Sequence, residues 1–392
     1  MSDTWIHIPT PGDHYSAKYG SAVITIVHEF ARVFARRGGV TEVIVAPGTQ
    51  RDRAEGESES ETGAGRAVEA RFSPHPTRQQ MVLDAVLGRV GGQRLFMPRH
   101  YAAAVEAIPC EFDGPVFVHN TPAPTPLLAR ARPRAQHCLW LHNEIWRSYS
   151  GGEVRRVVGE VDRVICASEF LARDTLERLG DEMRLRSKVR AVRSGVNIEQ
   201  FRPALARTRN EVPTIVSIGR VVPEKGVHLL IQAALELKER GHKFRVRIVG
   251  SRQFDASESL TAYETELREL AAPLGATVQF VPAVDRIRVV EEFQGADVFC
   301  APAVWNEPLG LTILEAMACG VPTVTTRRGG IPEVGGQAAL YFDPDVPGEL
   351  ADVLEHLITD DAARQRYGAA ARAHAETMSW EAQYRELNAA LN

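Results

Sequence analysis

The feature that most constrains the fold of this chain is a repeated alternation of short apolar runs with longer amphipathic stretches. Each run is rich in Val, Ile, Leu or Phe. Continuous apolar runs of this kind are typical of strands that are buried on both faces of a parallel sheet. The runs lie at residues 5–8, 42–46, 94–97, 116–119, 138–142, 163–167, 214–218, 244–249, 278–281 and 298–301. The pattern predicts an α/β protein with parallel sheets.

The length and composition of the chain predict two domains. A chain of 392 residues is long enough for two domains of ordinary size. With 44% hydrophobic and 24% charged residues, each domain can bury its own core. We place the first domain at residues 1–203 and the second at residues 204–378. The formal net charge of -4 provides no basic field for nucleic acid, so we expect no nucleic-acid partner.

The five cysteines are widely spaced, and no two of them form a C-x-x-C pair. Most lie in apolar, strand-like contexts, which favours reduced core residues of a cytoplasmic protein. The first residues show no basic segment followed by an apolar one, and no stretch reaches the ~18 uninterrupted apolar residues of a membrane span. We therefore expect neither secretion nor a spanning segment.

Residues 5–46 have the pattern of a strand, a helix and a second strand. Apolar residues recur at helical spacing over residues 23–34, and the Arg-Arg-Gly-Gly sequence at 36–39 ends this helix. Gly20 lies at the start of the helix, where a small residue lets a phosphate approach the backbone amides. A plain helix N-cap is the competing explanation.

Two glutamates in the second half, Glu307 and Glu315, border an apolar run with the composition of a helix. If the helix starts near Leu309, both carboxylates can lie near its N-terminus. The amides of Leu309, Gly310 and Leu311 would then face a phosphate. Carboxylates repel phosphate, so we expect these two to accept hydrogen bonds from hydroxyl groups of an attached sugar or ribose. The alternative is a surface helix with two solvated glutamates.

Two cations, Arg220 and Lys225, follow the run at 214–218 and precede an amphipathic segment at 227–240. Ligands of parallel sheets bind beyond the carboxyl ends of the strands, so two fixed cations there can face an anion. Solvation in a turn is the alternative.

Histidines stand at two further strand ends. His119 ends the run at 116–119 and His142 ends the run at 138–142, with Glu144 close behind. A histidine at such a position is more often structural than functional, and the residues alone leave both interpretations open.

The stretch from Glu307 onward resembles the signature of the retaining glycosyltransferases of family 4, which have the GT-B fold. That signature is a Glu, seven residues, a second Glu, Ala-Met-Ala-Cys-Gly-Val-Pro and then Gly-Gly-Ile-Pro-Glu, and the sequence reproduces all of it. The resemblance covers the C-terminal half closely and the N-terminal half loosely. The Leu-His-Asn sequence at His142 is similar to a spore-coat-type branch, and a bacterial polysaccharide or natural-product branch is the alternative.

The resemblance implies two Rossmann-like domains that face a central cleft, with a helix at 379–392 crossing back to the first domain. It also implies metal-independent, retaining transfer of a hexose from a nucleotide-diphosphate sugar, with UDP as the expected nucleotide. The acceptor would be a hydroxyl of a saccharide, lipid or small molecule. By resemblance, the diphosphate would contact Arg220 and Lys225, the ribose Glu315, the base the segment around Val284, and the sugar Glu307 and His142. No cofactor beyond the donor is implied.

Several segments depart from this pattern or allow other interpretations. Residues 11–14 are Pro-Gly-Asp-His, where family members usually have a Gly-Gly pair. Residues 343–345 have the D-x-D form of a metal motif from another glycosyltransferase fold, and we expect no metal there. The basic run at 184–193 suits either a weak membrane contact or an exposed edge strand. Residues 50–71 suit a mobile loop, as an acceptor lid or a solvated insertion.

Two other functions remain open at this stage. A nucleotide-sugar epimerase or a phosphorylase of the same fold would convert the donor without this acceptor. A coat or binding protein with a vestigial site would bind without turnover. The simultaneous presence of Arg220, Lys225, Glu307, Glu315 and His142 favours an enzyme.

Overall fold

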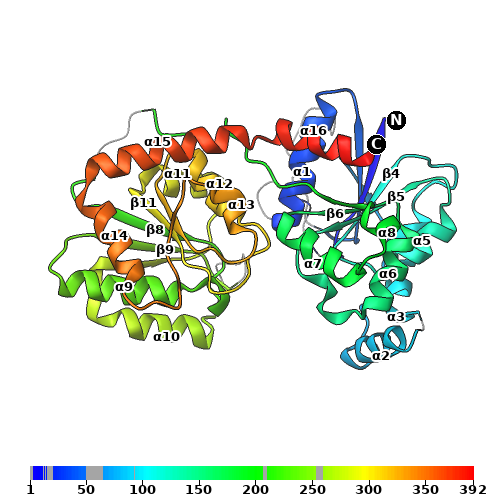
Figure 1. Cartoon of the computed structure of the whole chain (residues 1–392), viewed down its shortest axis with the longest axis horizontal. Coiled ribbons are helices and arrows are strands. Elements are labelled where there is room, and N and C mark those ends of the chain that lie inside the picture. The colour runs from blue at the N-terminus through cyan, green and yellow to red at the C-terminus, as the bar shows by residue number, and fades with distance from the viewer. Residues whose placement is uncertain are drawn as a thin grey trace. The chain divides into compact units, whose positions relative to one another are not determined.

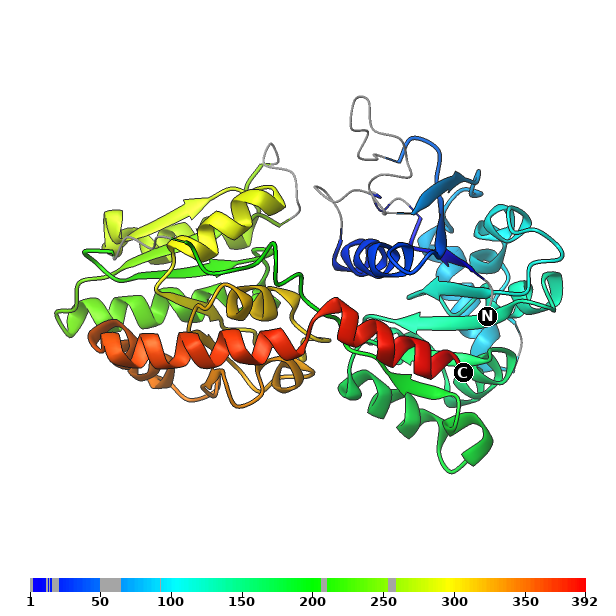
Figure 2. The same cartoon turned by 90° about the horizontal axis from the view of Figure 1, so that it is seen from above.

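The computed structural model describes residues 3–11, 13, 15, 21–49, 65–91, 93–205, 210–252 and 259–392. The chain divides into two compact units, shown in Figures 1 and 2. Unit 1 comprises Met1–Ser194 and Trp380–Asn392, and unit 2 comprises Gly195–Ser379. The sequence analysis places the boundary at residue 203. In the structure residues 195–203 belong to unit 2, because Val196 pairs with Ser379 and Phe201 is buried in that unit's core.

Within its described residues, unit 1 contains a parallel seven-stranded sheet with the strand order β3-β2-β1-β4-β5-β6-β7. Its strands are β1 Thr4–Ile8, β2 Val40–Val45, β3 Arg66–Glu69, β4 Pro115–His119, β5 Gln136–Leu141, β6 Arg163–Cys166 and β7 Val189–Ala191. Its longer helices are α1 Ala22–Ala35, α2 Arg78–Arg89, α6 Gly151–Glu160, α7 Glu169–Leu179 and α16 Trp380–Leu391. Shorter helices are α3 Phe96–His100, α4 Ala102–Glu106, α5 Thr125–Ala131, η1 Ile145–Ser148 and α8 Met183–Arg186.

The C-terminal helix α16 belongs to unit 1, where it packs on α1 (Figures 1 and 2). Trp5 of β1 stacks on Phe34 of α1 and on Tyr384 of α16. Trp380, at the start of α16, meets Phe30 edge to face. Because aromatic side chains bury large areas, this cluster anchors the helix to the first sheet and confirms the crossing that the resemblance implies.

Within its described residues, unit 2 contains a parallel six-stranded sheet with the order β10-β9-β8-β11-β12-β13. Its strands are β8 Thr214–Ile218, β9 Arg245–Val249, β10 Val278–Val281, β11 Val298–Ala301, β12 Thr323–Thr325 and β13 Leu340–Tyr341. Its helices are η2 Pro223–Lys225, α9 Val227–Glu239, α10 Ala262–Ala271, η3 Ala272–Thr277, α11 Arg286–Gly295, α12 Leu311–Ala318, α13 Ile331–Gly335, α14 Glu349–Thr359 and α15 Asp361–Thr377.

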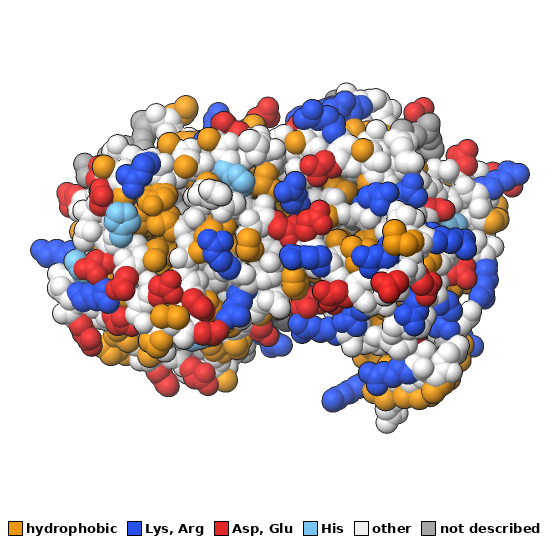
Figure 3. All heavy atoms as spheres, viewed as in Figure 1, with side chains coloured by type: hydrophobic (Ala, Val, Ile, Leu, Met, Phe, Trp, Pro, Cys, Tyr) orange, Lys and Arg blue, Asp and Glu red, His pale blue; other side chains and the backbone are white. Residues whose placement is uncertain are grey.

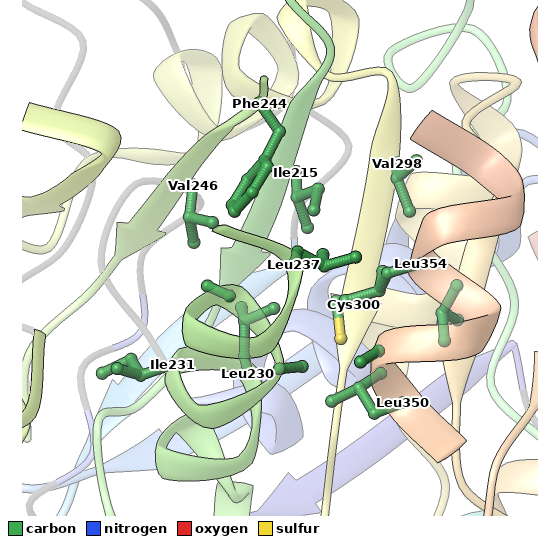
Figure 4. Close-up of a cluster of buried hydrophobic side chains, with 14 of the residues drawn as sticks. Ile215, Leu230, Ile231, Leu237, Phe244, Val246, Val298, Cys300, Leu350 and Leu354 are labelled. Carbon is green, nitrogen blue, oxygen red and sulfur yellow. The ribbon is translucent and has the colours of Figure 1, made fainter. Parts of the chain in front are cut away.

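The core of unit 2 lies between this sheet and its helices. On one face, Leu230 and Leu237 of α9 and Leu354 of α14 pack against Ile215 and Val246 of the sheet (Figure 4). A second apolar cluster involves α11, α12 and α15. Because these clusters lie between the sheet and its helices, the loops at the carboxyl ends of the strands can carry polar groups.

Three local expectations need correction or refinement. The strand expected at 94–97 is wrong, because these residues lead into helix α3, whose first amides bind the Asp84 carboxylate. In the loop expected at 50–71, residues 66–69 form β3, and residues 50–64 lie outside the described residues. The basic run at 184–193 forms part of α8 and then β7, which is at the edge of the sheet, in agreement with the edge-strand interpretation.

None of the helices in the described part of the chain is long and apolar enough to cross a membrane.

Candidate functional site

The loops after β8 and β9 lie in close contact at the carboxyl edge of the second sheet. Gly219 donates its amide to the Val249 carbonyl at 3.0 Å, and Gly250 donates to Val281 at 2.9 Å. Gly250 has a φ of +138°, and a Cβ on it would lie 1.9 Å from the Gly219 carbonyl oxygen. Only glycine allows both this conformation and this approach. This close contact fixes the backbone next to Arg220.

The next loop carries the two predicted cations. Arg220 is exposed, and its side chain has no partner among the described residues. Lys225 ends the short helix η2 and lies against Glu307, with 2.5 Å between its Nζ and the Glu307 Oε2. The indole of Trp305 donates to the same oxygen at 2.9 Å. The Lys225 side chain is 28% exposed and that of Glu307 is 14% exposed, so the ion pair is largely shielded from water.

Close backbone contacts hold the Lys225 and Glu307 loops together. Gly226 has a φ of +68°, and a Cβ there would lie 1.9 Å from the Pro302 carbonyl oxygen. Val304 donates its amide to the Glu224 carbonyl at 3.0 Å. Gly329 meets the Glu307 backbone similarly, since its Cβ would lie 2.3 Å from the Glu307 carbonyl oxygen. The sequence signature is therefore partly explained by geometry, because its Gly-Gly pair packs against the first glutamate.

Helix α12 begins at Leu311, and its N-cap Gly310 has a φ of +100°. This start is two residues later than Leu309, near which the sequence analysis places it. The amides of Leu309, Gly310 and Leu311 donate to no other group in the part of the chain that the structure describes. Unpaired amides at a helix N-terminus, with the positive end of the helix dipole, are suited to bind an anion.

Glu315 of α12 is almost completely buried and is held by a partner that sequence reasoning missed. Its Oε1 accepts a hydrogen bond from the Nη2 of Arg286 at 2.6 Å, and its side chain is 6% exposed. Arg286 opens helix α11, directly after the Asp285 N-cap. Val284 lies just before this helix and packs against the same apolar cluster as α12. The only sequence signal for Arg286 is its place after the strand β10.

In unit 1 the predicted His142 is part of a row of three stacked imidazoles. His7 Nδ1 lies 2.9 Å from His119 Nε2, and His119 Nδ1 lies 2.9 Å from His142 Nε2. All three residues are buried, and they come from β1, the end of β4 and the end of β5. Asn120 supports the row, since its side-chain oxygen accepts the His142 amide at 2.7 Å.

Burial keeps this row neutral. It lowers the pKa of His7 and of His142 to about 3, and it lowers the pKa of His119 well below its usual value. A neutral imidazole has one N–H and one bare nitrogen, so two hydrogen bonds in series allow two arrangements: every proton on Nδ1, or every proton on Nε2. The outer atoms, His142 Nδ1 and His7 Nε2, have no partner in the described part of the chain. The proton state of one end therefore sets that of the other.

The predicted residues are distributed over both units. Lys225, Glu307 and the start of α12 lie together in unit 2. His142 belongs to unit 1. Gly20 lies outside the described residues. Glu144 forms an ion pair with Arg147 at 2.6 Å.

The D-x-D sequence at 343–345 is engaged locally. Asp345 is paired with Arg328, and its amide donates to Asp343. No group of three or more His, Cys, Asp or Glu side chains among the described residues is arranged to hold a metal ion.

Comparisons with known proteins show what the second half of this chain is similar to. Residues 199–374 match the family described as Glycosyl transferases group 1. Spore coat protein SA of Bacillus subtilis is 29% identical over 287 residues, which are 68% of this chain and 74% of that protein. The D-inositol 3-phosphate glycosyltransferase of Streptomyces bingchenggensis is 32% identical over 58% of this chain, and the match spans about half (51%) of that enzyme.

The fold is also that of solved glycosyltransferases. The structure of Anabaena HepE in complex with UDP-glucose superposes with a TM-score of 0.69 at 18% identity, covering 98% of this chain and 99% of that one. A glycosyltransferase from Rickettsia africae gives the same TM-score at 17% identity over 99% of this chain and 97% of that one. This chain therefore has the GT-B fold and carries a group 1 glycosyl transferase domain at residues 199–374.

Proposed function

We propose that this chain is a retaining, metal-independent hexosyltransferase that uses a UDP-linked sugar and glycosylates a hydroxyl of a saccharide, lipid or small-molecule acceptor. The observation that carries the proposal is the Lys225–Glu307 ion pair of 2.5 Å, in the same loop cluster as the start of α12. A shielded cation, a shielded carboxylate and unpaired amides suit a ligand that carries both phosphates and hydroxyl groups. The complexes of HepE with UDP and with UDP-glucose support this donor class.

Donor binding would exchange the partners of Lys225. In the structure the charge of Lys225 is compensated by Glu307. A diphosphate carries more negative charge than one carboxylate, so it would draw Lys225 and the unpaired Arg220 toward itself. Glu307 would then be free to accept hydrogen bonds from the sugar hydroxyls. The ion pair thus keeps both groups in place until the donor arrives.

The same groups would stabilise the leaving diphosphate. Arg220, Lys225 and the amides of Leu309, Gly310 and Leu311 would face charge that grows as the glycosidic bond breaks. One well-placed donor of this kind contributes about 3 kcal/mol to a transition state. Because the chain itself can supply this positive charge, the proposal includes no metal ion and no cofactor beyond the donor.

The rest of the site suits the nucleoside. Glu315, held by Arg286, would accept the ribose hydroxyls, and the backbone around Val284 would contact the base. The amide of the neighbouring Ala283 is already fixed by the Ser251 hydroxyl at 3.3 Å. The role of His142 toward the sugar stays a prediction from the family resemblance.

Retention of configuration would follow from attack on the leaving-group side. Glu315 is held in an ion pair with Arg286, and in the proposed donor complex Glu307 accepts hydrogen bonds from the sugar hydroxyls. These roles disfavour the use of either glutamate as a covalent nucleophile. In the proposed reaction the acceptor oxygen bonds to the anomeric carbon as the phosphate oxygen leaves, and that phosphate takes the proton of the acceptor hydroxyl.

A cytoplasmic location suits the chain, since its five cysteines are free thiols.

The test is turnover of UDP-, GDP-, ADP- and dTDP-sugars with a panel of hydroxyl acceptors, with the anomeric configuration of the product read by NMR. Arg220→Ala is compared with Arg245→Ala, an exposed arginine at the amino end of β9. We expect Arg220→Ala to lower kcat more than it raises KM, while Arg245→Ala changes neither. An unchanged kcat in Arg220→Ala would remove its proposed role. Donor conversion without an acceptor would favour an epimerase or phosphorylase, and donor binding without turnover would favour a non-catalytic binding or coat protein.

A further inference from the structure

Helix α2 of unit 1 presents its apolar side chains to solvent. Valine and leucine side chains on this helix and at its C-cap are strongly exposed: Val82 is 59% exposed, Leu83 47%, Val86 49% and Val90 77%. On the molecular surface in Figure 3, the region of α2 shows hydrophobic side chains next to Lys or Arg side chains. An exposed apolar helix face of this kind marks an interaction site rather than an ordinary surface.

The inner face of α2 is polar, so the helix cannot turn this apolar face inward. Asp84 is 2% exposed, and its carboxylate accepts the amides of Leu95, Phe96 and Met97 at distances from 2.7 to 3.1 Å. These bonds tie α2 to the start of α3. A rotation of α2 that buried its valines would expose Asp84 and leave three amides unpaired, at a cost for each of them.

A second contact fixes the same orientation. Gly88 packs against Glu153 of α6 so closely that a Cβ on it would lie 1.7 Å from the Glu153 Oε1. Glu153 is itself held by Arg94 at 3.0 Å and by the Ser150 amide at 2.9 Å. At the other end, Thr77 and Gln80 form a capping box that fixes the first turn of α2. The outward apolar face is therefore built into the fold of unit 1.

The charged side chains that α2 itself exposes to solvent are both positive. At about 100° per residue, Val82 and Val86 lie at the centre of the exposed face, Leu83 and Val90 lie on one flank, and Arg78 and Arg89 lie on the other. Both arginines are exposed. Asp84 is the only acidic residue between positions 70 and 105 of the sequence, and it is buried. We call Arg78, Val82, Leu83, Val86, Arg89 and Val90 the α2 surface.

We propose that the α2 surface docks this protein onto an anionic lipid bilayer. An apolar helix face flanked by arginines suits the boundary between the acyl chains and the head groups, where valine and leucine insert and guanidinium groups bind phosphates. The proposal stands on α2 alone and does not depend on the proposed transfer reaction. It places the membrane contact on residues 78–90 rather than on the basic run at 184–193. In that run Lys188 already donates to the Val161 carbonyl at 2.6 Å.

A second copy of this chain fits the α2 surface less well. A 12-residue helix is about 18 Å long and about 10 Å wide, so its exposed face covers roughly 200 Å², far below the roughly 800 Å² per partner of a stable interface. Twofold pairing of the same face would also bring Arg78 and Arg89 of one copy near those of the other, and like charges repel. A lipid surface has neither restriction.

The test is flotation of the full chain with vesicles of phosphatidylcholine alone or with about 30 mol% phosphatidylglycerol. The variant Val82→Ser/Val86→Ser removes apolar area from the centre of the α2 surface. Its matched control, Ile287→Ser/Val346→Ser, changes two exposed apolar residues of unit 2 that are 64% and 50% exposed. A third variant, Arg78→Gln/Arg89→Gln, removes only the charge. Circular dichroism verifies the fold of each, and the Asp84 and Gly88 contacts are left unchanged.

We expect the wild type and the unit 2 control to float with the anionic vesicles, and the double-serine variant to lose at least ~10-fold in the partition coefficient. The arginine variant should lose the preference for phosphatidylglycerol, and added salt should weaken wild-type binding. Equal flotation of wild type and double-serine variant would overturn the proposal. A wild type that binds neither kind of vesicle would also overturn the proposal. Sedimentation equilibrium would then show whether the α2 surface instead pairs two copies of the chain.

Discussion

The Lys225 ammonium lies 2.5 Å from the Glu307 carboxylate, joining a loop that follows β8 to a loop that follows β11. The pair holds two opposite charges side by side. Each charge then has a different expected partner, phosphate for Lys225 and sugar hydroxyls for Glu307. Replacing the two residues separately should therefore have different effects on the nucleotide and on the nucleotide sugar.

Glu307→Gln should separate recognition of the sugar from recognition of the phosphates. The amide keeps the shape of the side chain and releases Lys225 from its ion pair. We expect UDP to bind at least as tightly as to wild type, and UDP-sugar to lose ~10-fold or more, because hydrogen bonds to a charged acceptor contribute about 1.5–3 kcal/mol. Isothermal titration with both ligands measures this. An equal loss for UDP and UDP-sugar would mean that Glu307 does not contact the sugar.

Gly329→Ala should impair the site indirectly, by displacing the backbone of Glu307. The new Cβ would lie 2.3 Å from the Glu307 carbonyl oxygen, at a φ of +61°. Forcing a non-glycine residue into such a conformation costs about 1–3 kcal/mol, and the clash should also displace Glu307. We expect a lower Tm and a lower transfer rate.

The matched control for this change is Gly295→Ala. Gly295 ends helix α11, and a Cβ there meets nothing within 4 Å. This variant should keep or slightly raise Tm and leave transfer unchanged. If both alanine variants behave alike in thermal unfolding and in turnover, the close approach of Gly329 to Glu307 has no consequence.

A double-mutant cycle on Arg286 and Glu315 tests whether their ion pair positions the second glutamate. Arg286→Met leaves a carboxylate that is nearly buried without its partner, which should destabilise unit 2 by about 1–3 kcal/mol. Adding Glu315→Gln removes that charge and should recover part of the loss, so the double variant should be more stable than the sum of the single effects. Urea unfolding of the four proteins measures the coupling, and additive effects would show that the pair is not coupled.

The histidine row predicts that unit 1 loses stability in acid. Each imidazole is neutral when folded, and the pKa of His7 and of His142 is lowered to about 3 by burial, against about 6.5 in an unfolded chain. The unfolded chain therefore binds more protons between these values, so stability is complete above pH ~6.5 and falls as the pH drops toward ~3. At pH ~5.5 the loss is about 1 kcal/mol for each histidine.

His7→Phe should reduce this pH dependence by one histidine's share, although it also leaves His119 Nε2 unpaired and lowers stability at every pH. Replacing the exposed His356, which lies in unit 2, by Gln is the control for the loss of a histidine outside the row. Urea titrations at several pH values, followed by tryptophan fluorescence, suit this test because Trp5, Trp140, Trp146 and Trp380 all lie in unit 1. A pH-independent wild type would contradict the buried, neutral row.

Continuous apolar runs predicted most of the strands in the two sheets, because a strand that is buried on both faces has a recognisable local sequence. The run at 116–119 is part of β4, and the run at 214–218 is β8. The apolar residues at 94–97 have the same composition but lead into α3, because Asp84, distant in sequence, binds the amides at its start. No pattern within four residues contains that information.

Prediction of the candidate site was limited in the same way, because local sequence does not show which distant residues come together. The sequence predicted that Glu307 precedes a helix and that Glu315 lies within it, and helix α12 has this arrangement although it starts two residues later than expected. Their partners Lys225 and Arg286 come from the helices η2 and α11, and only the order of strands in the sheet brings these elements to the glutamates. The row His7, His119 and His142 likewise depends on the pairing of β1 with β4, two strands that are not consecutive in the chain, and of β4 with β5.

The most direct test of the central claim is calorimetric titration of UDP into the wild type, Lys225→Met and Lys243→Met, the last an exposed lysine before β9. We expect the wild type and Lys243→Met to bind UDP alike, whereas Lys225→Met should lose at least ~10-fold in affinity because one charge-assisted contact to the diphosphate is removed. Equal affinity in all three proteins, or no binding of UDP by the wild type, would contradict a UDP-sugar site at the Lys225–Glu307 pair.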